Sequence, residues 1–284
     1  MLREPFGKYK VAVSEYEVDY SEGKRKIPMM FFFPSDTGSK MCPYKDAAYQ
    51  KGMREGNVND NGVKTYCYTD GTLSSEKEKY PVVMYSHGLN GFLMESTVLC
   101  ADLASNGYIV VSIGHPLGTE TEGDLKKLGL LWEEDISFAM ESLQKIQDGQ
   151  LETCFSGRLA IEDGINLLGV SFGGCCSIGT LLKDSRAKCA INLDGRLFID
   201  VEPVYTDKPV LVLCNPLNYT AYAKLKKIAY PNLTVKKYRK VTHWEFSDGI
   251  YLSERGKSNR QWADEISENR ARLCMDVIMG RNCL

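Results

Sequence analysis

The stretch Ile165-Asn166-Leu167-Leu168-Gly169-Val170-Ser171-Phe172-Gly173-Gly174 decides how this chain folds. Its apolar first half predicts a buried strand. Its second half matches the pattern Gly-x-Ser-x-Gly, which places a serine on the sharp turn between a strand and a helix. A serine in such a turn has a strained backbone, so the residues two positions away on either side must be small. The pattern therefore predicts that Ser171 stands at the carboxyl end of a sheet as a nucleophile.

The composition is that of one soluble globular domain. The chain has 284 residues and no linker rich in Pro, Gly or Ser, so we expect a single domain over residues 1–284. A net charge of −2 argues against nucleic acid as the main partner. The sequence contains no signal peptide and no stretch long enough to span a bilayer, so we expect a cytoplasmic protein without stable membrane insertion. The ten cysteines are then expected to be reduced, and the oligomeric state is left open.

Apolar runs separated by helix-length segments recur through most of the chain. Continuous apolar runs of this kind are typical of parallel strands that are covered on both faces. The predicted buried strands are residues 82–85, 108–113, 165–170, 189–193 and 210–213, and the predicted helices are residues 95–105, 132–146 and 258–278. We therefore predict an α/β-hydrolase fold, which is a doubly wound, mostly parallel sheet with helices on both faces.

The first 79 residues depart from this pattern. Residues 9–20 and 25–35 are predicted to form two strands joined by a hairpin-type connection. Residues 36–79 are polar and rich in Lys, Asn, Asp and Gly, so we expect an irregular insertion with one helix near residues 45–54. Whether this insertion covers the site as a lid is a question that the sequence leaves open.

A serine hydroxyl becomes a good nucleophile only when a base takes its proton, and the base is usually a histidine oriented by a carboxylate. The chain has three histidines, His87, His115 and His243. In hydrolases of the predicted fold the triad runs in the order Ser, acid, His, and only His243 follows Ser171. We therefore predict His243 as the base. His87 and His115 end two predicted strands and are expected to orient loops or line the pocket.

Asp194 is the favoured acid, because it directly follows residues 189–193 and so lies at the carboxyl end of a predicted strand. The next strand ends in Cys214 and Asn215, and an amide cannot stabilise an imidazolium by charge. Weaker alternatives for the acid are Asp200, Glu202, Asp207 and Asp248.

The oxyanion of an acyl-transfer intermediate needs two backbone donors. We predict one at the amide of Phe172, which opens the helix after the serine, and the other at the amide of Leu89. Gly88 lets the backbone next to Leu89 approach the substrate closely. Gly88, His115 and Trp244 are predicted to contact the substrate, and this chemistry needs neither a metal nor an organic cofactor.

These motifs resemble those of the platelet-activating factor acetylhydrolases, a family of serine esterases with the α/β-hydrolase fold. The resemblance runs from about residue 26 to about residue 252. Its motifs are Tyr80-Pro81-Val82-Val83-Met84-Tyr85-Ser86-His87-Gly88-Leu89, Asp102-Leu103-Ala104-Ser105-Asn106-Gly107-Tyr108-Ile109-Val110, residues 169–174, Ile191-Asn192-Leu193-Asp194 and Thr242-His243-Trp244-Glu245-Phe246-Ser247-Asp248.

The resemblance implies a nucleophile at Ser171, an acid at Asp194 and a base at His243, with oxyanion amides at Leu89 and Phe172. The serine motif and the His-Gly-Leu motif are shared with dienelactone hydrolases, cutinases and other esterases. An acid placed after the strand that directly follows the serine is more specific to this family.

The sequence thus predicts a serine hydrolase that cleaves carboxylic esters of small molecules through an acyl-enzyme. Esters with short acyl groups are the expected substrates, and platelet-activating factor-like or oxidised phospholipids belong to the same class. An amidase or peptidase with the same triad is an alternative, because acyl transfer does not determine the leaving group. A binding protein that kept the fold and lost catalysis is a second alternative.

Overall fold

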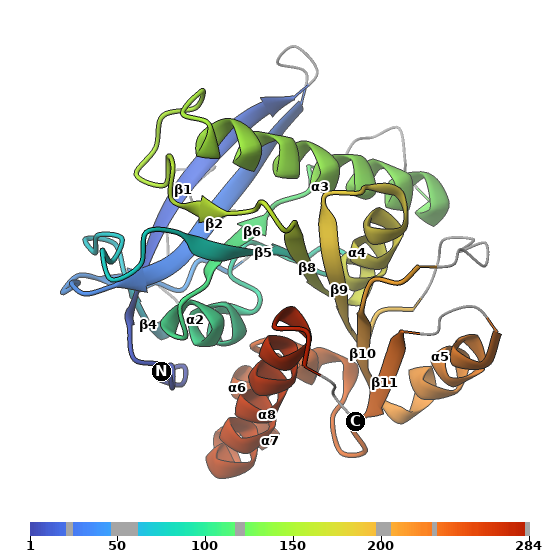
Figure 1. Cartoon of the computed structure of the whole chain (residues 1–284). Coiled ribbons are helices and arrows are strands. Elements are labelled where there is room, and N and C mark those ends of the chain that lie inside the picture. Colours follow the sequence, from blue (N-terminus) through green and yellow to red (C-terminus); the bar gives the residue numbers. More distant parts are fainter. Residues whose placement is uncertain (21–24, 47–61, 117–122, 197–205, 229–231, 282–284) are drawn as a thin grey trace.

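The computed structural model describes residues 1–20, 25–46, 62–116, 123–196, 206–228 and 232–281. Over these residues the backbone forms one eleven-stranded sheet with helices packed against it (Figure 1). The strands follow the order β11-β10-β9-β8-β5-β6-β2-β1-β4-β3, and β7 (Leu159–Ala160) pairs with β5 outside this path.

The middle of the sheet is parallel. Its strands are β5 (Tyr80–Ser86), β6 (Ile109–Ile113), β8 (Ile165–Val170), β9 (Ala187–Leu193), β10 (Val210–Cys214) and β11 (Leu233–Lys237). β5 pairs with both β6 and β8, and β9, β10 and β11 follow β8 in order. These strands contain the continuous apolar runs of the sequence, and most of their residues are buried because helices cover both faces.

The first two strands form an antiparallel pair, as the sequence predicts. β1 (Lys10–Tyr20) runs against β2 (Arg25–Ser35) along its whole length, and β2 joins β6 in antiparallel register. This pairing places the amino-terminal hairpin beside the parallel strands, so the hairpin and the central strands form one continuous sheet (Figure 1).

The insertion at residues 36–79 is partly β structure, which differs from the predicted irregular chain. β3 (Met41–Pro43) and β4 (Lys64–Tyr68) extend the sheet beyond β1. Thr65 and Cys67 of β4 are buried while their neighbours are not, but five alternating residues are too short a pattern to stand out in a polar segment. The helix predicted near residues 45–54 falls mainly on residues 47–61, outside the described residues, as does much of the segment that would form a lid.

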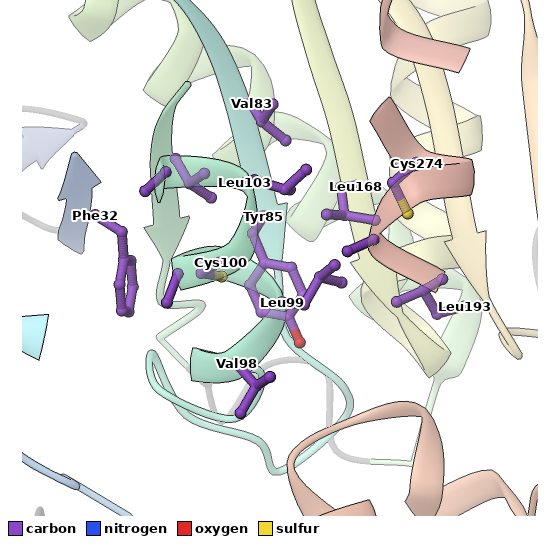
Figure 2. Close-up of a cluster of buried hydrophobic side chains, with 14 of the residues drawn as sticks. Phe32, Val83, Tyr85, Val98, Leu99, Cys100, Leu103, Leu168, Leu193 and Cys274 are labelled. Atoms are coloured by element: carbon purple, nitrogen blue, oxygen red, sulfur yellow. The ribbon is translucent and has the colours of Figure 1, made fainter. Parts of the chain in front are cut away.

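Helices cover the two faces of the sheet (Figure 1). One face packs against α3 (Leu125–Gln147), α4 (Ser171–Lys183) and α5 (Pro216–Ile228); the other packs against α2 (Thr97–Ser105), α6 (Gly249–Leu252) and α8 (Arg260–Ile278), with α7 (Glu254–Ser258) beside α6. Successive strand residues point to opposite faces. Met84 therefore lies in the first core, whereas Tyr85 lies in the second, beside Leu99 and in the same cluster as Cys274 (Figure 2).

The helix α3 is longer than predicted, because its start is set by a capping residue. The side chain of Asp124 accepts hydrogen bonds from the amides of Lys126 and Lys127, each at 3.1 Å, which satisfies two amides of the first turn. The predicted apolar stripe is buried along its whole length: Trp132, Ile136, Met140, Leu143 and Ile146. The stripe thus identifies the buried face, while the cap determines where the helix begins.

The nine cysteines within the described residues form no disulfide, and eight of them are buried. Burial raises the pKa of Cys100 and Cys176 well above the usual thiol value, so these side chains stay protonated and act as small apolar groups. None of the helices in the described ranges is both long enough and apolar enough to cross a lipid bilayer.

The carboxyl ends of the parallel strands lie at one edge of the sheet, which is where ligands bind in open α/β sheets. Ser86 ends β5, Ser171 follows β8, Asp194 follows β9 and Asn215 follows β10. Side chains from distant parts of the sequence are thereby gathered at this edge.

Candidate active site

Ser171 stands on a strained turn between β8 and α4. Its backbone has φ = 53°, in the left-handed region that residues other than glycine rarely adopt. A methyl group at Gly173 would collide with the carbonyl oxygens of Ser86 and His87, and one at Gly169 would collide with the backbone of Gly173. The glycines of the motif are therefore required by close packing of the turn against β5 and against itself.

His243 connects Ser171 to Asp194. It lies on the short 3₁₀ helix η2 (His243–Phe246), which follows β11. Its Nε2 is 3.0 Å from Oγ of Ser171, and its Nδ1 is 2.7 Å from Oδ2 of Asp194. A neutral imidazole that donates Nδ1–H to the carboxylate can accept the serine proton at Nε2, which is the arrangement of a proton-transfer triad.

The carboxylate of Asp194 is buried and surrounded by donors. Oδ1 accepts hydrogen bonds from the amide of Asn215 at 2.7 Å and from Nδ2 of Asn218 at 3.0 Å. Oδ2 accepts a second bond from Asn215, through Nδ2 at 2.6 Å, in addition to the bond from His243. These donors compensate the carboxylate for the water that it loses on burial.

Sequence reasoning missed Asn215 and Asn218. The lack of a carboxylate at the end of β10 excludes Asn215 as the acid, although an amide at that position can orient the acid of the neighbouring strand. The only signal in the sequence is the position of Asn215 at the end of a strand that is expected to pair with the strand of Asp194.

The turn after β9 fits tightly against the nucleophile. Asp194 has φ = 58°, and the next residue, Gly195, has no room for a side chain because a methyl group there would collide with the carbonyl oxygen of Ser171. Asn192 accepts a hydrogen bond from the amide of Gly195 at 2.7 Å and donates one to the hydroxyl of Tyr222 at 2.8 Å. This set of contacts holds the acid and the serine at a constant separation.

The segment after β5 lies next to the serine. A methyl group built on Gly88 would be 3.4 Å from Cβ of Ser171, so the backbone at Gly88 lies close to Ser171. Leu89 follows it, with a side chain that is 41% exposed. Phe172 lies in the first turn of α4, where the helix dipole favours a developing negative charge. These are the positions predicted for the two oxyanion amides.

A buried polar network includes Ser86, the last residue of β5, which precedes the His-Gly-Leu segment. Oγ of Ser86 is 2.7 Å from Nε2 of His115, and Nδ1 of His115 is 3.0 Å from Oδ2 of Asp135. Arg25 donates two hydrogen bonds to Asp135, both at 2.7 Å. The ring of Trp132 stacks on His115 with a centroid separation of 3.9 Å.

The sequence predicts that His115 contacts the substrate, but its burial does not favour that contact. Its side chain has no exposed surface, and both ring nitrogens have partners. Burial lowers its pKa, against the opposing effect of Asp135, so the ring stays neutral. His115 thus holds the strand ends together, which is the role that the sequence also suggested for it.

His87 holds the backbone of its own loop. Its Nδ1 donates to the carbonyl oxygen of Gly88 at 2.7 Å, and its Nε2 accepts a bond from the amide of His115 at 3.3 Å. Burial lowers the pKa of His87 to about 3, so both bonds are made by a neutral ring. This placement agrees with the predicted role of His87 in orienting a loop.

We expect Asp135→Asn to lower the free energy of unfolding by about 3 kcal/mol, because removing one partner leaves a largely buried guanidinium without its counter-charge. Asp148→Asn, at the exposed end of the same helix, is the matched control and should change stability by less than about 0.5 kcal/mol. Urea unfolding of the two variants measures both values. Equal free energies of unfolding of the two variants would contradict the proposed contribution of this network to stability.

Other features near the triad are exposed. Trp244, predicted to contact the substrate, follows His243 directly and is 58% exposed. A cleft of about 780 Å³ is lined by the residues that follow Leu89, from Asn90 to Met94, together with Pro28, Met30 and His115 among others. Within the described ranges, no group of three or more His, Cys, Asp or Glu side chains could hold a metal ion.

Comparison with known proteins shows similarity to one group of esterases. The family model for platelet-activating factor acetylhydrolase, isoform II, matches residues 6–117, which extend from just before β1 to just after β6 and include the His-Gly-Leu segment. The platelet-activating factor acetylhydrolase of Bos taurus is 28% identical over 172 residues, which is 46% of this chain and 38% of the relative. The enzyme of Gallus gallus is 25% identical over 230 residues, which is 62% of this chain and 54% of the relative.

The chain is similar to the platelet-activating factor acetylhydrolases. This confirms the resemblance that the motifs suggested, although the chain spans well under two thirds of the length of the curated relatives that it matches.

A solved structure supports the fold independently. The ferulic acid esterase from Streptomyces cinnamoneus superposes with a TM-score of 0.71 at 20% sequence identity, over 97% of this chain and 92% of that one. At this level of identity the likeness concerns the fold, and it confirms the predicted α/β-hydrolase fold.

Proposed function

We propose that this chain is a serine hydrolase that cleaves carboxylic esters of small molecules. The observation that carries the proposal is the hydrogen-bonded chain from Ser171 through His243 to Asp194, with separations of 3.0 and 2.7 Å. Its similarity to acetylhydrolases adds support, because those relatives are named for removal of an acetyl group.

In the proposed mechanism, Oγ of Ser171 gives its proton to Nε2 of His243 and bonds to the carbonyl carbon of the ester. The carbonyl oxygen becomes negatively charged, and the amides of Leu89 and Phe172 donate hydrogen bonds to it. The intermediate then collapses: the bond to the alcohol oxygen breaks, and the alcohol leaves with the proton from His243. A water molecule, activated in the same way, hydrolyses the acyl-enzyme and releases the acid.

Asp194 acts through His243. Its charge favours the imidazolium that forms during each proton transfer, and its hydrogen bond to Nδ1 keeps Nε2 directed at the serine. Asn215 and Asn218 bind the carboxylate from the other side, so they are proposed to orient Asp194.

We propose short-acyl esters as substrates, with platelet-activating factor-like and oxidised phospholipids as members of that class. Gly88 and the exposed Trp244 are the residues we expect against the bound ester, because one lies at the serine and the other follows the base.

A panel of nitrophenyl esters from acetyl to decanoyl tests this function, run together with an acetylated phospholipid and a nitroacetanilide. We expect kcat/KM to be highest for the shortest acyl groups and to be negligible for the anilide. Cleavage of the anilide at a comparable rate would indicate an amidase. Absence of turnover together with no covalent labelling by a fluorophosphonate would indicate a binding protein, because only an activated serine reacts readily with that reagent.

A further inference from the structure

Glu95 is a buried carboxylate beside the triad that the proposed mechanism does not use. It lies just before α2 and is 9% exposed. Its Oε2 accepts a hydrogen bond from the amide of Gly88 at 2.7 Å. A methyl group on Gly91 would lie 2.7 Å from the same oxygen, so the glycine at this position leaves the space that the carboxylate occupies. Burying a carboxylate is costly unless it makes specific contacts, and here the main contact is the oxyanion segment.

The carboxylate is also close to the nucleophile. The position of a methyl group on Gly88 is 3.4 Å from Cβ of Ser171, 3.5 Å from Oε1 of Glu95 and 3.6 Å from Oε2. The serine and the Glu95 carboxylate therefore both lie against the backbone at Gly88. A bond that holds Gly88 here also determines where the next amide, that of Leu89, stands relative to Ser171.

Glu95 further joins the oxyanion segment to the segment that contains the base. The amide of Asp248 donates to the carbonyl oxygen of Glu95 at 2.9 Å. The carboxylate of Asp248 accepts bonds from the amides of Thr97 at 2.7 Å and Val98 at 3.1 Å, which lie in the first turn of α2. Asp248 is five residues after His243, so the two halves of the site meet at Glu95.

We propose that Glu95 is a positioning residue for ester hydrolysis: its carboxylate holds the amide of Gly88 so that the amide of Leu89 faces the oxyanion. This inference rests on the proposed function and concerns a residue outside the triad. Because the Gly88 amide is engaged by Glu95, the Leu89 amide remains as the donor of this segment.

The ionisable groups around Glu95 determine how its charge varies with pH. Burial raises the pKa of Glu95, while the bond from Gly88, the charge of His243 and the hydroxyl of Tyr85 act to lower it. Tyr44 and Asp248 are the other ionisable groups near it. The bond from the Gly88 amide is strongest when Glu95 is ionised, because a charged acceptor makes a stronger hydrogen bond than a neutral one.

The test compares Glu95→Gln and Glu95→Ala with the wild-type protein. Gln keeps an oxygen that can accept the Gly88 amide but removes the charge. We expect its kcat on nitrophenyl acetate at pH 8 to stay within about threefold of wild type, because the acceptor for the Gly88 amide is retained. Ala removes the acceptor, and we expect kcat to fall about 100-fold, as when one oxyanion donor is lost, with KM within about threefold.

Hydrogen exchange provides a readout that does not depend on turnover. Peptides covering residues 86–92 should exchange faster in Glu95→Ala than in wild type, and at the wild-type rate in Glu95→Gln. The matched control is Glu152→Ala, an exposed glutamate on the loop after α3, which should leave both kinetics and exchange unchanged.

The proposal is overturned if Glu95→Ala keeps kcat within threefold and residues 86–92 exchange as in wild type. It is also overturned if Glu95→Gln loses as much activity as Glu95→Ala, because an oxygen that accepts the Gly88 amide would then not be what the site requires. If the wild-type protein hydrolyses no ester, the proposed function fails. In that case, faster hydrogen exchange of residues 86–92 in Glu95→Ala would still support the hydrogen bond between Glu95 and the Gly88 amide.

Discussion

Replacement of Ser171 with alanine is expected to lower kcat/KM for nitrophenyl acetate by about 10⁵-fold or more. The variant retains the oxyanion amides and the substrate site but has no oxygen to form the acyl-enzyme. Only the acceleration that comes from binding and from the oxyanion donors should remain. A spectrophotometric assay of nitrophenol release measures the loss, and a fluorophosphonate probe should no longer label the protein.

The matched control is Ser177→Ala, on the same helix. Ser177 is also buried, and its hydroxyl donates to the carbonyl oxygen of Gly173 at 2.8 Å, so its loss tests the effect of removing a serine from α4 without touching the proposed nucleophile. We expect near-normal turnover and normal labelling from this variant. Near-normal turnover from Ser171→Ala itself would rule the acyl-enzyme mechanism out.

Asp194→Asn is expected to lower kcat by about 10⁴-fold while leaving the protein folded. The shape of the side chain is retained, but an amide cannot stabilise the imidazolium by charge. Three donors from Asn215 and Asn218 already surround the carboxylate. An NH₂ group at this position would face either one of those donors or the Nδ1–H of His243. If it faced the imidazole, the ring would adopt the tautomer that cannot accept the serine proton.

Turnover measurements on Asp194→Asn should be paired with those on Asp207→Asn. Asp207 was a weaker candidate for the acid, and it is exposed on the segment before β10, so its loss should change kcat by less than twofold. Equal activity of the two variants would remove Asp194 from the mechanism. A melting temperature close to that of wild type for both shows that folding is not the cause of any difference.

Much of the architecture can be predicted from local patterns. The parallel strands are continuous apolar runs, and α3 shows its buried stripe at helical spacing, because strands and helices covered by a core must be apolar at a regular period. The strands β3 and β4 could not be predicted in this way, since three and five residues in a polar segment provide too little of a pattern. The start of α3 was also missed, because Asp124 caps the helix and sets its first residue at Leu125, well before the predicted start at residue 132.

The candidate site could be predicted to a similar extent. Ser171 is identified by its motif, and His243 follows because only one histidine comes after the serine. Asp194 is identified by its place at a strand end. The contact of His115 with the substrate stays a prediction, and its burial does not favour it; a histidine at a strand end can point either to solvent or into the protein. Asp135 and Trp132 lie twenty and seventeen residues further along the chain, and in the folded protein they enclose the ring of His115.

The amino-acid sequence alone determined the order of the apolar parallel strands and of the helices α2, α3 and α8, the turn at Ser171, and the order of the proposed nucleophile, acid and base along the chain. These follow from short-range requirements: periodic burial, small residues in a tight turn, and a strand end where the chain must leave the sheet. Only the tertiary structure decided that Asn215 and Asn218 bind the acid, that Arg25 and Asp135 hold His115, and that Glu95 binds Gly88. Such contacts join segments that are far apart in the sequence, so no local sequence pattern indicates them. They form because a polar group that is buried without a hydrogen-bond partner is costly in free energy.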